Sequence, residues 1–128
     1  DWVLLLPEDS DLSAAMIRAD LEVISRARLG VVIIDSHGRA WRNGVVGTTI
    51  GASGLPALLD MRGEEDMYHY KLRVTTIATA DELAAGASLM MGQASESTPV
   101  VLARGFPYPL REGNAQELIR KKERDLFR

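Results

Sequence analysis

Apolar and polar positions divide the chain into short apolar runs, which predict strands, and longer periodic stretches, which predict helices. The apolar runs at residues 2–6, 31–34 and 99–103 have the length of buried strands, and Pro7 closes the first of them. Polar and apolar residues alternate over residues 71–77, where β-branched side chains gather. We therefore expect four strands.

The first helix is expected over residues 12–28, where apolar residues recur at helical spacing. Ser10 and Asp11 precede it as candidate N-caps, and Gly30 follows it as a terminating residue. Because this helix stands between two apolar runs, the order is typical of a right-handed parallel crossover.

A second helix is expected over residues 79–91, where Thr79 and Glu82 have the spacing of a capping box and Gly92 follows the last turn. A third, on the surface, is expected over residues 115–122. With the strands, these helices predict a single α/β domain of mixed α+β character, with short apolar strands and crossover helices.

Glycines interrupt residues 35–54 so often that regular structure is not expected there. They alternate with charged and hydroxyl side chains at Gly38, Gly44, Gly47, Gly51 and Gly54. The stretch follows an apolar strand directly, and ligands in open α/β sheets bind beyond the carboxyl ends of strands. The sequence therefore predicts a glycine-rich loop that binds a metal or an anion.

Composition and charge narrow the class of protein. A chain of 128 residues, 46% hydrophobic and 26% charged, fits one globular domain and not a disordered segment. The net charge of −3 gives no electrostatic footprint for nucleic acid, and the absence of cysteine excludes thiolate metal sites. No apolar run approaches the roughly 20 residues of a membrane span. We expect a cytoplasmic protein that binds neither nucleic acid nor membrane.

Asp35 and Ser36 are candidate metal ligands at the end of the apolar strand. A carboxylate beside a hydroxyl offers the hard oxygen atoms that Mg²⁺ or Mn²⁺ accepts. The alternative is a turn in which Asp35 only binds the loop backbone. His37 could act as a base or a ligand, or lie in solvent.

Arg39 and Arg42 could bind an anionic substrate, because guanidinium groups match phosphate and carboxylate. Alternatively, both arginines pair with surface carboxylates while Trp41 anchors the core. Asp81 and Glu82 form a possible carboxylate pair, but acids are also favoured at the start of any helix.

Several ordered motifs resemble the coenzyme F420-0:L-glutamate ligase (γ-glutamyl ligase) family. They are DSHGRAWRNG at residues 35–44, IGASGL at 50–55, ADELA at 80–84, MGQ at 91–93 and PVV at 99–101. The resemblance spans residues 2–127 and corresponds to the later part of the family's sequence. The family's amino-terminal part, with an aspartate that shares the metals, is expected to lie before Asp1.

This resemblance implies a GTP-dependent ligase that adds L-glutamate in γ-linkage to coenzyme F420-0 through an acyl phosphate. It implies two divalent ions, Mg²⁺ or Mn²⁺, with K⁺ as a further candidate. It also implies a homodimer or a complementing amino-terminal segment as partner. The alternative is a non-catalytic binding or scaffold fragment that retains the ligase fold.

The resemblance also places site residues on this sequence, although it identifies no catalytic side chain. The family's metal ligands fall on Asp35, Ser36 and Gln93, and Arg39 and Arg42 would shape the anionic site. His69 stands where a turn glycine is expected. The family's nucleotide loop falls on Met91, Gly92, Gln93, Ala94, Ser95, Glu96, Ser97 and Thr98.

Overall fold

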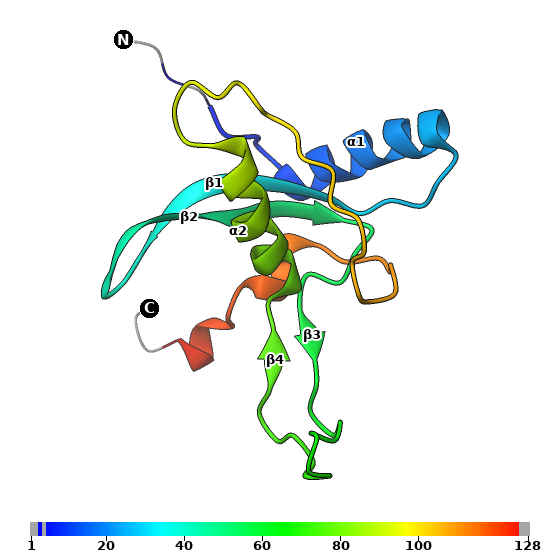
Figure 1. Cartoon of the computed structure of the whole chain (residues 1–128), viewed down its shortest axis with the longest axis vertical. Helices are drawn as coiled ribbons and strands as arrows, with labels where there is room; N and C mark the ends of the chain where they lie inside the picture. Colours follow the sequence, from blue (N-terminus) through cyan, green and yellow to red (C-terminus); the bar gives the residue numbers. More distant parts are fainter. Residues whose placement is uncertain (1–2, 4, 126–128) are drawn as a thin grey trace.

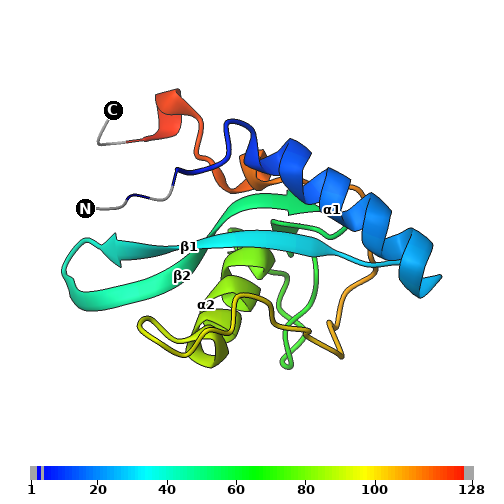
Figure 2. The same cartoon turned by 90° about the horizontal axis from the view of Figure 1, so that it is seen from above.

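A long β-hairpin lies between two helices at the centre of the fold (Figure 2). The computed structural model describes residues 3 and 5–125. The hairpin strands are β1 (Val31–Arg39) and β2 (Arg42–Ser53). Seen from above, helices α1 (Ser10–Ser25) and α2 (Thr79–Met91) cover opposite faces of this hairpin.

Two smaller parts complete the architecture. The short strands β3 (Leu59–Asp60) and β4 (Thr76–Ile77) pair in a second hairpin, which projects away from the helices (Figure 1). Two turns of 3₁₀-helix, η1 (Ala115–Leu118) and η2 (Lys122–Arg124), follow near the end of the chain. The predicted mixture of helices and strands is confirmed.

The predicted parallel crossover is wrong, because both sheets within the described residues are antiparallel. Strand β1 pairs with β2, from Val31 opposite Ser53 to Arg39 opposite Arg42. The glycine-rich residues 35–54 therefore form most of the hairpin and not an irregular loop. Some of these glycines allow close packing: a Cβ atom on Gly51 would overlap the backbone of α1 at Ser10.

Other predicted strands are shorter than expected or absent. Trp2 and Leu4 of the first run lie outside the described residues, and the rest of that run forms no strand. Residues 99–103 also form none, and residues 71–77 contribute only β4 and a single bridge from Lys71 to Glu65. An apolar run becomes a strand only where a neighbouring strand satisfies its backbone, and the described residues supply none for these runs. The predicted helix over residues 115–122 is likewise reduced to η1 and the start of η2.

Helix α1 begins earlier and ends earlier than predicted. Its N-cap is Asp9, whose carboxylate accepts the N–H of Leu12 at 2.8 Å, and its C-cap Arg26 has a φ of 54°. Asp11, predicted as a cap, instead accepts the N–H groups of Ala52 and Ala115, both at 2.8 Å. This carboxylate thus ties α1 to β2 and η1.

Helix α2 has the predicted bounds, but the predicted capping box is wrong. The buried Thr79 hydroxyl donates to the carbonyls of Pro56 at 2.6 Å and Ala57 at 3.2 Å. The N-cap is Ala78, which makes no side-chain capping bond, so Glu82 has no reciprocal partner at this end of the helix. A hydroxyl at a helix start can bind tertiary carbonyls as readily as local amides, and spacing alone does not separate the two.

Polar side chains of α2 satisfy the backbone of β2 along the edge that β1 leaves unpaired. The Asp81 carboxylate accepts the N–H of Thr49 at 2.9 Å, and the Ser88 hydroxyl accepts the N–H of Gly47 at 3.2 Å. Unpaired strand edges otherwise invite other strands to pair. These two bonds therefore fix α2 beside β2, and with it the loop that follows α2.

The buried core is small, and much apolar surface is exposed. The buried apolar side chains are mainly alanines, namely Ala14, Ala52, Leu55, Ala57, Ala80, Ala84 and Ala115. The accessible surface is 10437 Å², whereas a compact monomer of 14.0 kDa exposes roughly 6,700 Å². No helix within residues 3 and 5–125 is long and apolar enough to cross a bilayer.

Gly86→Ala is expected to raise the free energy of unfolding by about 0.5–1 kcal/mol. Gly86 is exposed within α2, and a Cβ atom there meets nothing within 4 Å. Alanine therefore gains helix propensity without a clash. Urea denaturation followed by circular dichroism measures the change, and a destabilised variant would contradict this expectation.

Candidate functional site

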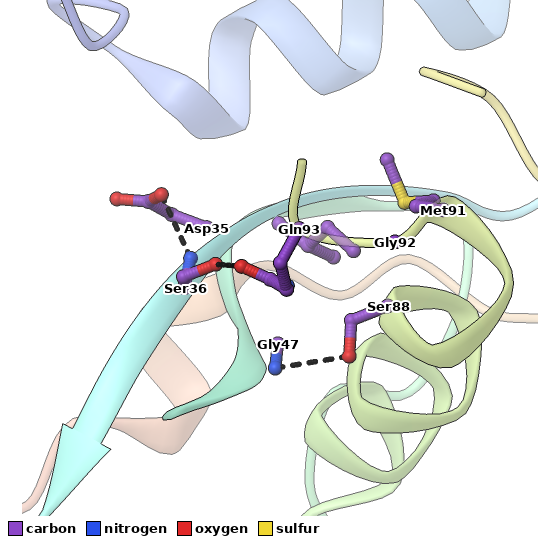
Figure 3. Close-up of a pocket in the computed structure, with 8 residues that line it drawn as sticks. Asp35, Ser36, Gly47, Ser88, Met91, Gly92 and Gln93 are labelled. Carbon is purple, nitrogen blue, oxygen red and sulfur yellow. Dashed lines mark hydrogen bonds between the residues drawn. The ribbon is translucent and has the colours of Figure 1, made fainter. Parts of the chain in front are cut away.

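The side chains of Ser36 and Gln93 meet between β1 and the end of α2. The Ser36 hydroxyl donates to Oε1 of Gln93 at 2.6 Å, although the two residues are 57 positions apart (Figure 3). Strand β1 positions Ser36, while Gln93 follows the Gly92 cap of α2. The structure thus brings together two of the three predicted metal ligands.

Asp35 lies inside β1 opposite Thr48, so the predicted turn is wrong, although its carboxylate does bind the backbone as that alternative expected. Its Oδ1 accepts the N–H of Ser36 at 2.7 Å, and its carboxylate points away from Gln93 (Figure 3). This direction follows from the strand, because successive side chains alternate between its faces. The oxygen atoms of Asp35 and Ser36 therefore lie on opposite sides of the strand.

A cavity of about 130 Å³ adjoins this contact. It has room for a few waters or an ion, and it is too small for a nucleotide. Met91 and Gly92 of the predicted nucleotide loop line it together with Gln93, whereas the rest of that loop does not. The other lining residues are Ile34, Asp35, Ser36, Gly47 and Ser88.

The remaining loop residues, 94–98, are exposed and bonded mainly among themselves. The Glu96 carboxylate accepts the N–H of Ala94 at 2.8 Å. Backbone N–H groups of Ala94, of Glu96 itself and of Gln93 together lower the pKa of the Glu96 carboxyl. Sequence reasoning gave Glu96 no separate role, because an acid in a polar connection is typical of a solvent loop.

A second, wider cavity of about 440 Å³ lies on the other side of Gly47, which borders both. Arg39 lines it and Arg42 does not. Neither arginine has an ion-pair partner within residues 3 and 5–125, and Trp41 is 98% exposed, so the predicted core anchor is wrong. Its other lining residues are Val46, Thr48, Thr76, Ile77, Ala78, Asp81, Glu82 and Ala85.

Comparison with known sequences finds a matching protein family and several similar proteins that share one name. The family described as F420-0:gamma-glutamyl ligase matches residues 1–105. The chain belongs to this family. Proteins named coenzyme F420:L-glutamate ligase are 48% identical in Methanococcus maripaludis strain C6 over 96% of the chain, and 46% identical in Methanocaldococcus jannaschii over 98%.

A third relative of that name, from Archaeoglobus fulgidus, is 41% identical over 98% of the chain. The aligned region covers 50%, 51% and 50% of these three relatives, so the chain spans about half of their length. The family membership predicted from the sequence motifs is confirmed.

This member of the F420-0:gamma-glutamyl ligase family has few charged side chains near the Ser36–Gln93 contact that could bind a metal. No group of three or more His, Cys, Asp or Glu side chains gathers into a metal site within residues 3 and 5–125. Asp35 is the single acidic residue that lines the smaller cavity, and its carboxylate points away from Gln93. The donor set of Asp35, Ser36 and Gln93 consists of oxygen atoms, which suits Mg²⁺ and Mn²⁺ better than softer metals.

Proposed function

We propose that this chain contributes one side of the active site of a ligase that joins L-glutamate in γ-linkage to coenzyme F420-0, using GTP and divalent ions. The observation that carries this proposal is the Ser36–Gln93 contact beside Asp35, in a chain that belongs to the F420-0:gamma-glutamyl ligase family. The names of the relatives support the reaction class.

Asp35, Ser36 and Gln93 would hold Mg²⁺ or Mn²⁺. The carboxylate brings negative charge, and the hydroxyl and amide oxygens complete a hard donor set. Because Asp35 points away from Gln93, the arrangement favours two ion positions over one shared by all three side chains. Bound ions supply charge that neutralises phosphate oxygens during transfer.

The proposed reaction proceeds in two balanced steps. A carboxylate of F420-0 attacks the terminal phosphorus of GTP, which gives an acyl phosphate and GDP. The amino group of L-glutamate then attacks the acyl carbon and forms the C–N bond of the amide. The bond from the acyl carbon to the phosphate oxygen breaks, phosphate leaves, and the nitrogen gives up a proton to the departing phosphate or to water. The residues around the smaller cavity would position the phosphoryl group, because that cavity holds little more than such a group.

The nucleotide and the anionic substrate would occupy neighbouring surfaces. Residues 91–98 pass from the smaller cavity to solvent and would contact GTP. Arg39 lines the wider cavity, and its positive charge has no ion-pair partner among the described residues. This cavity has room for the body of an organic anion, which the guanidinium group could bind. Arg42 lies outside this cavity and is the weaker candidate.

A second polypeptide surface would complete the site, either a homodimer partner or a complementing segment. The excess exposed area supports this, as does the outward side of α1, where Leu12, Met16, Val23 and Ile24 are exposed. Large exposed apolar surface is typical of interaction sites. The second candidate function is a non-catalytic binding module, which the single carboxylate at the smaller cavity favours.

Calorimetric titration of the chain with GTP, with and without Mn²⁺, tests the ligase proposal. We expect binding that requires Mn²⁺ and prefers GTP over ATP, because the oxygen donors would bind the metal–nucleotide complex. Chelation of the metal serves as the control. Binding that ignores the metal would favour the non-catalytic module. No binding would mean either that the second polypeptide surface is essential or that the site is inactive, and the same titration on a longer chain decides between them.

A further inference from the structure

The carboxylate of Glu96 occupies the inside of the loop that carries Gln93. It accepts the N–H of Ala94 at 2.8 Å, and the backbone N–H groups of Ala94, of Glu96 itself and of Gln93 lower the pKa of this carboxyl. A carboxylate accepts several hydrogen bonds and donates none, so it suits a turn that presents only N–H groups. The loop is thereby wrapped around one of its own side chains.

Gly92 provides the space for this arrangement. A Cβ atom on Gly92 would overlap the Glu96 carboxyl group, and Gly92 has a φ of 75° with a ψ of −178°. That backbone conformation is restricted almost entirely to glycine. The glycine and the glutamate therefore form a matched pair on either side of Gln93 and Ala94.

Little else holds this loop. One bond ends α2, from the Gly92 N–H to the Ser88 carbonyl. Otherwise the hydrogen bond of residues 92–98 with the rest of the described chain is the one from Ser36 to Gln93. The other bonds stay within the loop, such as Thr98 Oγ1 to the Glu96 carbonyl at 3.2 Å. Gln93 is thus held by Glu96 at its backbone and by Ser36 at its side chain.

We infer that Glu96 is a positioning residue, whose carboxylate fixes the Gln93 loop so that the Gln93 amide oxygen stays beside Ser36 for a divalent cation. This inference rests on the proposed function for the metal role of Gln93. Glu96 itself need not touch the cation, since its oxygens bind backbone amides. Groups that orient a metal ligand in this way commonly affect metal affinity as strongly as some ligands do.

Glu96→Gln tests the inference with almost no change in size. The amide keeps one oxygen that can accept the N–H of Ala94, but it removes the negative charge and puts an N–H donor in place of the second oxygen, so the loop should loosen. We expect the Mn²⁺ affinity of the chain, measured by electron paramagnetic resonance of free Mn²⁺, to fall roughly 10- to 100-fold. Glu96→Asp, which keeps the charge, should lose less.

Two further variants separate positioning from a general effect on folding or charge. Gly92→Ala should displace the same carboxylate without changing any charge, and should weaken Mn²⁺ binding as Glu96→Gln does. Glu64→Gln makes the matched amide change on the distant β3–β4 hairpin and should leave Mn²⁺ affinity unchanged. Because Glu96 is exposed, its removal should leave the thermal midpoint of unfolding unchanged.

A metal-free measurement keeps the outcomes distinct. The side-chain amide resonances of Gln93 in the nitrogen-15 spectrum should move toward free-glutamine positions in both Glu96→Gln and Ser36→Ala. Resonances that stay in place in Glu96→Gln would overturn the inference. The inference would also be overturned if Glu96→Gln left the Mn²⁺ affinity unchanged while Gln93→Ala lowered it. In that case the metal role proposed for Gln93 would still be supported. Mn²⁺ affinity that is equal in Gln93→Ala and the unsubstituted chain would overturn the metal role proposed for Gln93.

Discussion

Asp35→Ala is expected to abolish Mn²⁺-dependent nucleotide binding while the chain remains folded. Asp35 is the single acidic residue among those that line the smaller cavity, so its removal takes away the negative charge of the proposed donor set. The loss should exceed the roughly 10- to 100-fold effect typical of groups that only orient a ligand. Calorimetric titration with GTP and Mn²⁺ measures it, and a thermal melt reports on folding.

The fold should tolerate this change because Asp35 contributes little to packing. The side chain is exposed, and within residues 3 and 5–125 its carboxylate accepts only the N–H of the next residue, Ser36, at 2.7 Å. Asp35→Asn keeps an acceptor for that N–H and removes the charge, so it should lose binding as well. Asp20→Ala, on an exposed position of α1, removes a carboxylate elsewhere and should bind normally. Unchanged binding in Asp35→Ala would leave Asp35 with a backbone-bonding role alone.

Helix α2 was predictable to its last residue, whereas the central hairpin was not. Thirteen residues with an apolar face and a terminating Gly92 give a local signal that tertiary contacts do not override. The glycines of β2 give the opposite signal, because glycine favours turns in the absence of packing. In the folded chain Gly47 and Gly51 are instead the points where helices approach the strand most closely. His69 does adopt the conformation of a turn glycine, with a φ of 66°.

The pattern along α1 shows what periodicity can and cannot predict. Its apolar residues indicate that one side is buried, but Arg18 and Glu22 face the protein while Val23 and Ile24 face outward. Arg18 forms ion pairs with Glu22 at 3.2 Å and Glu112 at 2.8 Å. A hydrophobic pattern therefore predicts that one side of a helix is buried, but it does not predict which surface covers that side. Here it is consistent with a second polypeptide surface against α1.

The candidate site was predictable only in part for the same reason. Spacing made Asp35 a plausible ligand, but the contact between Ser36 and Gln93 joins residues 57 positions apart. The motif resemblance named both residues, and the fold accounts for their meeting, because α2 lies along β2 and ends beside β1. The sequence placed Glu96 in the nucleotide loop but gave it no role of its own, because its partners are backbone N–H groups, which residue types do not reveal.

Gly47→Ala is expected to lower the free energy of unfolding by about 1–3 kcal/mol, and to weaken Mn²⁺ binding with it. A Cβ atom on Gly47 would lie 2.5 Å from the carbonyl oxygen of Ala84 and 2.7 Å from Cβ of Ser88. Both belong to α2, so the helix would have to move away from β2. That movement would also strain the bond from Gly47 N–H to the Ser88 hydroxyl. Urea denaturation measures the loss of stability.

Gly38→Ala is the matched control, since Gly38 lies in the partner strand β1 and a Cβ atom there meets nothing within 4 Å. It should be neutral or stabilising by up to about 1 kcal/mol, because alanine restricts the unfolded chain. Equal unfolding midpoints for the two variants would mean that α2 does not press against Gly47. Ser88→Gly in the Gly47→Ala background should restore only part of the stability. It removes one of the two clashing groups, while the Ala84 carbonyl belongs to the helix backbone and no side-chain change can remove it.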